Sequence, residues 1–400
     1  MNNLQFIVIF FIIGVILYFP IFSVGFAGDD VIQLVNYPYF HNVHRAFTIF
    51  NEVIAIPSSS HMGISGFFYR PIPFAIYTLL YFFSHANPFY FHIVQFTLYI
   101  FSTYLLFLFL SAFFPKKLSL GLALIFLIHP VNNELAAYIA ALADTLCLFF
   151  GMLALVILSK SRKQSFLTVC SVCILLLLSF LSKESGMLFL LLVCGYLLYK
   201  KCIRVYIVPF IIIVSCYFLC RIYASKHVLF HTLPNITQDL STLQRLSLSP
   251  QIAFAFIKEI IVHTRASIKP HAFEPTIISS IIPIFMFIII IVSLIFVWVA
   301  IKKRNKKNAE VLVFFSFWIL AGILIYIQII PLELLFANRW LYITEIGILG
   351  VAGSIIQTFR IKRNRWTTIC FYMVGIILLL YVIETFILNL MWHDWKRYMT

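Results

Sequence analysis

The chain has 400 residues, of which 62% are hydrophobic and only 11% are charged. A soluble domain carries about 25% charged residues, so these few charges exclude a water-exposed surface over most of the molecule. The formal net charge is +15, but 29 basic residues spread along a hydrophobic chain do not form the concentrated patch that binds phosphate backbones, so no nucleic-acid partner is expected.

Apolar segments long enough to cross a bilayer, about 20 residues each, recur along the chain. Clear candidates lie at 4–25, 88–114, 135–158, 205–223, 277–301, 309–330, 339–358 and 366–390, and shorter ones at 118–129, 166–182 and 185–199. A transmembrane β-barrel is excluded because its strands are segments of ~10 residues in which polar and apolar residues alternate. Here Leu, Ile and Phe occupy both the odd and the even positions of the apolar segments. The pattern predicts an all-α polytopic membrane protein with about 11 transmembrane helices.

Basic residues gather in clusters at 116–117, 160–163, 200–204, 302–307 and 360–365, and two predicted spans separate each cluster from the next. These clusters hold 17 of the 29 basic residues. Because loops rich in Lys and Arg stay in the cytoplasm, the clusters are expected on the cytoplasmic side. The net charge therefore reports the orientation of the chain in the membrane.

The loops between the clusters are then expected on the opposite side, at 26–86, 129–134, 183–184, 224–276, 331–338 and 391–400. This layout predicts one transmembrane domain over residues 1–390, with large external loops at 26–86 and 224–276, and a short external tail at 391–400. Within the first large loop, residues 72–84 are apolar, too short to span and rich in Tyr and Phe. That composition predicts a helix in the membrane interface.

Acidic residues near a membrane are costly, so each one needs an explanation. Asp29 and Asp30 follow the first predicted span directly, where they either face water at the end of the helix or form part of a site. Asp144 lies inside a predicted span, where a carboxylate normally faces a wet cavity or a partner. Lys183 and Glu184 form a turn between two apolar segments, where they either neutralise each other or serve a site.

Further polar residues fall on the same predicted side. Arg70 closes the first part of the large loop, where it could hold a phosphate or snorkel towards lipid headgroups. His129 and Glu134 flank an external turn; with Asp144 they could bind a metal, although the spacing matches no known ligand pattern. Arg339 leads into a late span. Acids, histidine and arginine from separate loops thus converge on one face, which favours a functional site.

Several short motifs follow one another in a fixed order along the chain. They are Gly28-Asp29-Asp30 with Asn36, Tyr69-Arg70-Pro71, Asn87-Pro88-Phe89 with His92, His129-Pro130 with Glu134, Ala143-Asp144, Lys183-Glu184 with Gly186, and Arg339 with Tyr342. This order resembles that of the GT-C superfamily of membrane glycosyltransferases. It looks closest to the protein O-mannosyltransferase-like group that includes the tetratricopeptide-containing O-mannosyltransferases, over roughly residues 1–390.

The resemblance implies a GT-C-like bundle that moves a hexose, with mannose as one candidate, from a polyprenyl-phosphate sugar to a hydroxyl of an acceptor protein or glycan. By analogy Asp29 is the general base, Asp30 orients the acceptor or shares that role, and Arg70, Lys183 and Arg339 bind the donor phosphate. The residues expected to line the site are Tyr69, His129, Glu134, Asp144, Glu184 and Tyr342. A single displacement inverts the anomeric configuration, and members differ in whether they use a divalent cation.

Two departures from the group stand out. Some members carry tetratricopeptide repeats after the last span, whereas the sequence here stops at Thr400: either the chain lacks a repeat domain or it is truncated, and the acceptor is left open. The acidic pair is Asp-Asp rather than the Asp-Glu of yeast-type enzymes. The competing interpretation is a secondary transporter that uses intramembrane acids, but it predicts internal repeats and midplane polar residues, which the sequence does not show. The bacterial plasma membrane, or the endoplasmic reticulum of a eukaryote, is the expected location, with the site facing away from the cytoplasm.

Overall fold

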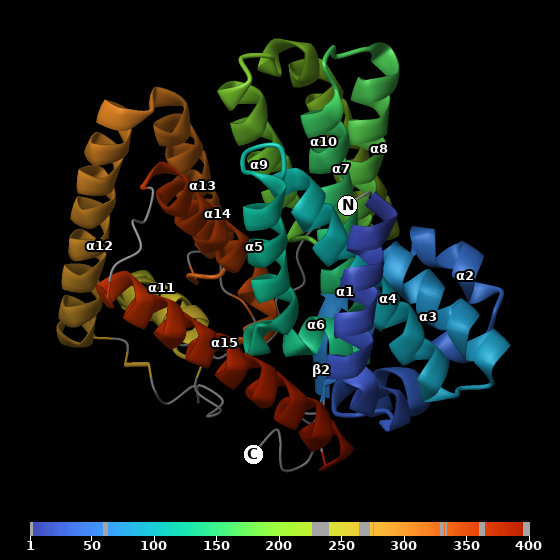
Figure 1. Ribbon diagram of the computed structural model, residues 1–400. Helices are drawn as coiled ribbons and strands as arrows, with labels where there is room; N and C mark the ends of the chain where they lie inside the picture. Colours follow the sequence, from blue (N-terminus) through green and yellow to red (C-terminus); the bar gives the residue numbers. More distant parts are fainter. Residues whose placement is uncertain are drawn as a thin grey trace. The chain divides into compact units, whose positions relative to one another are not determined.

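The computed structural model describes residues 3–58, 63–225, 240–263, 273–274, 276–328, 332, 334–359 and 365–394. The chain divides into two compact units. The first unit comprises residues 1–112, 133–233 and 384–400, and the second comprises residues 113–132 and 234–383. Both units are built almost entirely from helices (Figure 1), so the predicted helical class is confirmed.

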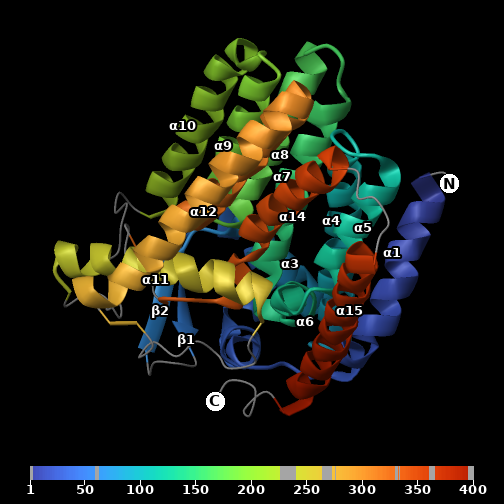
Figure 2. The same cartoon turned by 60° about the vertical axis from the view of Figure 1, so that its left-hand side comes forward.

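The first unit contains the longer series of elements. They are α1 (Asn3–Tyr18), η1 (Phe19–Ser23), η2 (Val31–Val35), η3 (Pro38–His41), α2 (Arg45–Thr48), η4 (Ile49–Asn51), β1 (Ile54–Ser58), β2 (Gly63–Phe68), α3 (Pro71–Ser84), α4 (Pro88–Leu110), α6 (Asn133–Ala137), η6 (Ile139–Ala141), α7 (Leu142–Lys160), α8 (Phe166–Ser182), α9 (Gly186–Tyr199), η7 (Ile203–Tyr206) and α10 (Ile207–Ala224), with the end of α15 and η10 (Trp392–Asp394). Helices α7, α8, α9 and α10 lie side by side in both views (Figures 1 and 2).

The second unit is a smaller set of helices. They are α5 (Lys116–Ile128), η5 (Pro130–Asn132), α11 (Thr242–Ile261), α12 (Ile277–Arg304), α13 (Lys306–Leu324), η9 (Asn338–Trp340), α14 (Tyr342–Thr358) and the part of α15 (Arg365–Met391) up to residue 383. Helices α13 and α14 form the most extensive packing pair, and α12 contacts both α11 and α13.

Within the described residues, seven helical segments are long and apolar enough to cross a membrane, or eight if α5 and the residues up to Ala137 count as one bent span. The seven are Asn3–Ser23, Pro88–Leu110, Ile139–Lys160, Ile203–Ala224, Ile277–Arg304, Lys306–Leu324 and Thr368–Asp394. They fit a multi-pass membrane protein. The other predicted spans form shorter apolar helices, such as the 14 residues of α9, which cover only ~21 Å of a core about 30 Å thick. The total of 11 spans stays a prediction.

The first large loop folds into short helices and a hairpin. The apolar residues 72–84 predict a helix, and the structure places α3 at Pro71–Ser84. The antiparallel hairpin of β1 and β2, in which Ile54 pairs with Phe68, was not predicted. Strand pairing depends on contacts between separate segments, so the periodicity of one short segment does not reveal it.

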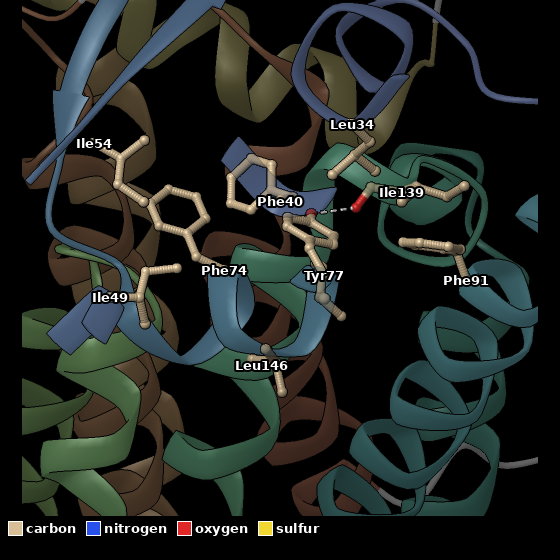
Figure 3. Packing of buried hydrophobic residues seen from close by; sticks show 10 residues of the cluster. Leu34, Phe40, Ile49, Ile54, Phe74, Tyr77, Phe91, Ile139 and Leu146 are labelled. Carbon is tan, nitrogen blue, oxygen red and sulfur yellow. Dashed lines mark hydrogen bonds between the residues drawn. The ribbon is translucent and has the colours of Figure 1, made fainter. Parts of the chain in front are cut away.

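A cluster of buried apolar side chains holds this loop against the helices of the first unit (Figure 3). The loop contributes Leu34, Phe40, Ile49 and Ile54; α3 contributes Phe74 and Tyr77; α4 contributes Phe91; and Ile139, Leu142 and Leu146 come from η6 and α7. The Tyr77 hydroxyl also donates to the carbonyl of Ile139 at 2.6 Å. The cluster therefore fixes α3 and the loop against the segment that begins α7.

The second large loop, predicted at 224–276, contains the 20-residue helix α11, which was not predicted from the sequence. Ser241 accepts from the backbone N–H of Gln244, and the Gln244 side chain accepts from the backbone N–H of Ser241. This capping box starts the helix by satisfying two backbone donors that would otherwise be unpaired. The rest of this loop at 226–239, 264–272 and 275 lies outside the described residues, as do residues 395–400 of the predicted tail.

Candidate functional site

The two predicted catalytic acids lie on a turn that begins at Gly28. Gly28 has a φ of +54°, a conformation that favours glycine, and a Cβ there would lie 3.2 Å from the Tyr138 hydroxyl. Asp29 is half-buried, and its backbone N–H donates to the same hydroxyl at 3.0 Å. The turn is thus held directly against the segment that precedes α7.

Asp30 anchors this turn through its side chain. It is 1% exposed, and its two carboxylate oxygens accept from the backbone N–H groups of Ala140 at 2.6 Å and of Ala27 at 3.2 Å. Burial raises the pKa of Asp30 well above its ordinary value, with a smaller contribution from the charge of Asp29, and the two N–H groups only partly offset this. Asp30 therefore fixes the backbone, and Asp29 is the more exposed acid of the pair.

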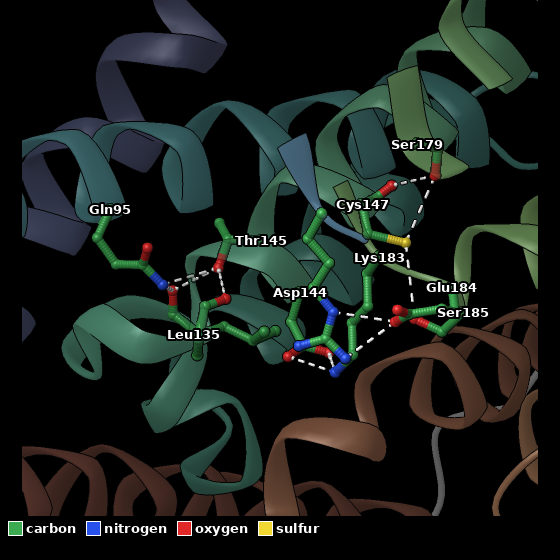
Figure 4. A network of polar contacts seen from close by, with 11 residues as sticks. Gln95, Leu135, Asp144, Thr145, Cys147, Ser179, Lys183, Glu184 and Ser185 are labelled. Atoms are coloured by element: carbon green, nitrogen blue, oxygen red, sulfur yellow. Dashed lines mark hydrogen bonds and ion pairs between the residues drawn. The ribbon is translucent and has the colours of Figure 1, made fainter. Parts of the chain in front are cut away.

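Lys183 and Asp144 form a buried ion pair (Figure 4). The Lys183 ammonium donates to both carboxylate oxygens of Asp144 at 2.7 Å, and the two side chains are 11% and 3% exposed. This pair explains why α7 tolerates a carboxylate in its first turn, since a buried charge requires a partner. It gives Lys183 a buried partner other than its neighbour Glu184.

Glu184 is instead paired with two arginines. It accepts from Nε of Arg70 at 2.9 Å, and its other oxygen lies 3.7 Å from Nη1 of Arg221. Burial alone would raise the pKa of the Glu184 carboxyl, but the charges of Arg70 and Arg221 outweigh it and bring the pKa below its ordinary value. Arg70 also lies 4.0 Å above the ring of Phe68, which limits the positions that its guanidinium can take.

Arg221 did not emerge from the sequence analysis. It lies in the last turn of α10, within a predicted span, and donates to the Tyr217 hydroxyl at 3.1 Å. The rule that singled out Asp144, a charge inside an apolar segment, would also have found Arg221. With Arg70, Lys183, Asp144 and Glu184 it forms a group that we call the charge cluster, with three cationic and two anionic side chains.

The segment from Tyr138 to Asp144 connects the acidic turn with the charge cluster, because Tyr138 and Ala140 hold Asp29 and Asp30 while Asp144 pairs with Lys183. Burial raises the pKa of Tyr77 well above its ordinary value, and the charge of Asp30 raises it further. The Tyr77 hydroxyl donates to the carbonyl of Ile139, which belongs to the same segment. The structure thereby brings together acids and cations from the first loop, α7 and the turn between α8 and α9.

The remaining predicted residues of the first unit have other surroundings. Tyr69 is buried, and its hydroxyl donates to the carbonyl of Phe50 at 3.0 Å, which ties it to the loop; its role in lining a site stays a prediction. Glu134 lies half-buried in the first turn of α6. Among the described residues, no group of three or more His, Cys, Asp or Glu side chains has an arrangement that could hold a metal.

His129, Arg339 and Tyr342 belong to the second unit. Nδ1 of His129 accepts from the backbone N–H of Val131 at 3.2 Å, so Nε2 carries the proton and donates to the carbonyl of Ile260 at 2.9 Å. Arg339 lies in η9, and Tyr342 is the buried first residue of α14. Their participation in a common site with the first unit stays a prediction.

Glu345 is a further buried acid of the second unit. It accepts from the side-chain amide of Asn132 at 2.7 Å and is 1% exposed.

Comparisons with protein-family models, with curated proteins and with solved structures found no match for this chain.

Proposed function

We propose that this chain is a membrane glycosyltransferase of the GT-C type. It transfers a hexose, with mannose as the first candidate, from a polyprenyl-phosphate sugar to a hydroxyl of an acceptor protein or glycan. The observation that carries the proposal is that, within one unit, the segment from Tyr138 to Asp144 contacts both the turn that bears Asp29 and the charge cluster: the Tyr138 hydroxyl accepts from the Asp29 N–H, and Asp144 pairs with Lys183. This combination supplies a base and an anion site next to the membrane.

The charge cluster suits the phosphate of a lipid-linked donor. Its three cationic and two anionic side chains leave one net positive charge, which matches the single negative charge of a phosphodiester. The guanidinium groups of Arg70 and Arg221 present planar donors suited to phosphate oxygens. The Lys183 ammonium is held in the same cluster by its ion pair with Asp144. Arg339, in the second unit, is a further candidate for the same role.

In the proposed reaction, Asp29 accepts the proton of the acceptor hydroxyl as its oxygen bonds to the anomeric carbon of the sugar. The bond between that carbon and the phosphate oxygen breaks, and the lipid phosphate leaves with the electron pair. Because there is one displacement, the anomeric configuration inverts. Asp30 holds the backbone of the turn through its bonds to Ala27 and Ala140. The cations stabilise the charge that develops on the leaving phosphate.

The proposed architecture is a bundle of about 11 transmembrane helices with α3 lying in the interface of the external leaflet. The apolar chain of the donor then stays in the bilayer while its phosphate reaches the charge cluster. The site faces away from the cytoplasm, in a bacterial plasma membrane or in the endoplasmic reticulum. A divalent cation is not required by these steps.

The test is transfer of labelled hexose from polyprenyl-phosphate hexose in membranes that contain the full chain. Removal of a general base typically lowers the rate by about 10²–10⁴-fold, so Asp29→Asn is expected to lose nearly all transfer. Glu310→Gln is the matched control, because Glu310 is an exposed carboxylate beside the basic cluster at 302–307, which is predicted to be cytoplasmic. Transfer by Asp29→Asn at the wild-type rate would exclude the proposed base.

One observation favours the second candidate, a secondary transporter. Asp144 and Lys183 form a buried ion pair beside an apolar helix, an arrangement that proton-coupled and ion-coupled carriers also use. Such a carrier moves protons or ions across sealed vesicles without any sugar donor. Ion flux that is lost in Asp144→Asn, together with no sugar transfer by the wild-type chain, would support the transporter instead.

A further inference from the structure

The turn that carries Asp29 is held by a tyrosine outside the charge cluster. The backbone N–H of Asp29 donates to the Tyr138 hydroxyl at 3.0 Å, and Tyr138 is 2% exposed. Tyr138 lies in an extended conformation between α6 and η6, with φ of −89° and ψ of 112°. This break in the helix directs the backbone so that Tyr138 meets Asp29 while Ala140 meets Asp30.

The ring of Tyr138 is itself fixed by the C-terminal end of the first unit. It stacks on Trp392 with the ring centroids 5.2 Å apart and an interplanar angle of 21°. The indole N–H of Trp392 donates to the side-chain oxygen of Asn133 at 2.6 Å. Both aromatic residues are 2% exposed, so the stack lies within the unit.

The contact extends to the first helix through two amide side chains. The Asn133 amide donates to the side-chain oxygen of Asn389 at 2.6 Å, and the Asn389 amide donates to the carbonyl of Leu17 at 2.9 Å. Both asparagines are almost completely buried. Figure 1 shows the end of α15 beside the C-terminal end of α1, where these bonds form. Every member of this chain of contacts therefore has a partner in a different segment.

We propose that Tyr138, stacked on Trp392, is a positioning residue that sets the location of the Asp29 carboxylate. We call Tyr138, Trp392, Asn133 and Asn389 the terminal clamp. The inference rests on the proposed function, because it assigns the clamp to the base of that reaction. Its physical basis is that a buried hydroxyl with one fixed ring orientation defines the place of the backbone N–H that it accepts, and catalytic groups must be held within fractions of an ångström.

The first test measures the contact itself and needs no enzymatic activity. Tyr138→Phe removes only the hydroxyl, so the Asp29 amide loses its acceptor. Hydrogen exchange at this amide, measured in the detergent-solubilised full chain, is expected to rise roughly three- to tenfold. Tyr90→Phe serves as the control, because Tyr90 is 49% exposed at the start of α4. Exchange at the wild-type rate in Tyr138→Phe would overturn the clamp.

The second test separates positioning from general stability. In Tyr138→Phe and Trp392→Leu, kcat for hexose transfer is expected to fall about 10- to 100-fold while KM for the polyprenyl-phosphate donor stays within a factor of two, because the donor phosphate binds elsewhere. An increase of the donor KM with unchanged kcat would contradict the positioning role.

The two tests fail in different ways. If the wild-type chain transfers no sugar, the proposed function is wrong, and exchange at Asp29 still shows whether Tyr138 holds the turn. If the wild type is active and Tyr138→Phe retains its kcat, the proposed function stands and the positioning role is wrong. A Trp392→Phe variant, which keeps an aromatic ring for the stack, is expected to recover most of the kcat lost in Trp392→Leu.

Discussion

Every charge of the cluster in the first unit has a partner on a different segment of the chain. Lys183 pairs with Asp144 across helices, and its neighbour Glu184 pairs with Arg70 from the first loop and with Arg221 from α10. Such pairs tie the turn between α8 and α9 to three other segments. They also keep the cations in place within an apolar molecule, where an unpaired charge is strongly unfavourable.

The Lys183–Asp144 pair gives a prediction about stability. Lys183→Met leaves the buried Asp144 carboxylate without its counter-ion, so the free energy of unfolding is expected to fall by about 3–5 kcal/mol. Chemical unfolding in detergent micelles measures this change. Lys160→Met is the control, because it removes an exposed lysine from the last turn of α7, the helix that carries Asp144. Its free energy of unfolding is expected to stay within about 0.5 kcal/mol of that of the wild type. Equal stabilities of the two variants would contradict the structural role of the pair.

The sequence located most of these residues but not their pairing. Asp144 could be found because a carboxylate inside an apolar segment is rare, and Lys183 and Glu184 because they interrupt another such segment. Sequence adjacency suggested that the last two neutralise each other, whereas adjacent residues in this turn point to different partners. The contact between Asp29 and Tyr138 joins residues 109 positions apart, and no pattern within either segment indicates it.

At the scale of helices, small residues decide how closely the elements pack. In the second unit, a Cβ added at Gly347 of α14 would lie 2.8 Å from the backbone nitrogen of Ile319 in α13, and one at Gly322 would lie 2.9 Å from that of Thr344. Membrane helices use such residues because lipid provides no hydrophobic drive for association, so close backbone contact supplies the attraction. The hydrogen bond from the Trp318 indole to the carbonyl of Ile343 reinforces the same pair at 2.9 Å.

The close contact predicts that Gly347→Ala forces α13 and α14 apart. Because the nearest atoms include backbone, no side-chain rotation relieves the clash, and the free energy of unfolding is expected to fall by about 1–3 kcal/mol. The midpoint of thermal unfolding in detergent is a suitable measurement. Gly375→Ala in α15 is the matched control, since a Cβ there meets no atom within 4 Å. A loss of stability as large in Gly375→Ala would argue against the packing explanation.

Helices were predicted better than the rest of the fold because a long apolar segment needs no information from elsewhere in the chain. The position of α3 followed from its apolar composition, its short length and its Tyr and Phe content. The β1–β2 hairpin and α11 were missed for different reasons. The hairpin depends on pairing between two short strands, whereas α11 is amphipathic and begins with a capping box, so it lacks the continuous apolar length by which a membrane span is recognised.

At the scale of the molecule, charge and hydropathy act together. Five clusters hold 17 of the 29 basic residues, and the rest of the chain is nearly neutral. The residues of the charge cluster and the acidic turn belong to this nearly neutral part. Positive charges next to a span resist translocation, so this distribution predicts that the charge cluster and the acidic turn lie on the side opposite to the basic clusters.

The predicted orientation places the basic clusters in the cytoplasm and the acidic turn outside it. The donor can reach the site from the external leaflet only in this orientation. A phosphatase reporter that folds only outside the cytoplasm is expected to be inactive when fused after Lys307 and active when fused after Ala224. The reason is that 302–307 carries five basic residues beside α12 and α13, whereas Ala224 ends α10 on the side predicted for Asp29. A cytoplasmic fluorescent reporter at the same two positions is the control and should give the reverse pattern. Phosphatase activity after Lys307 would reverse the topology and place the acidic turn at the cytoplasmic face, where the proposed transfer to an external acceptor could not occur.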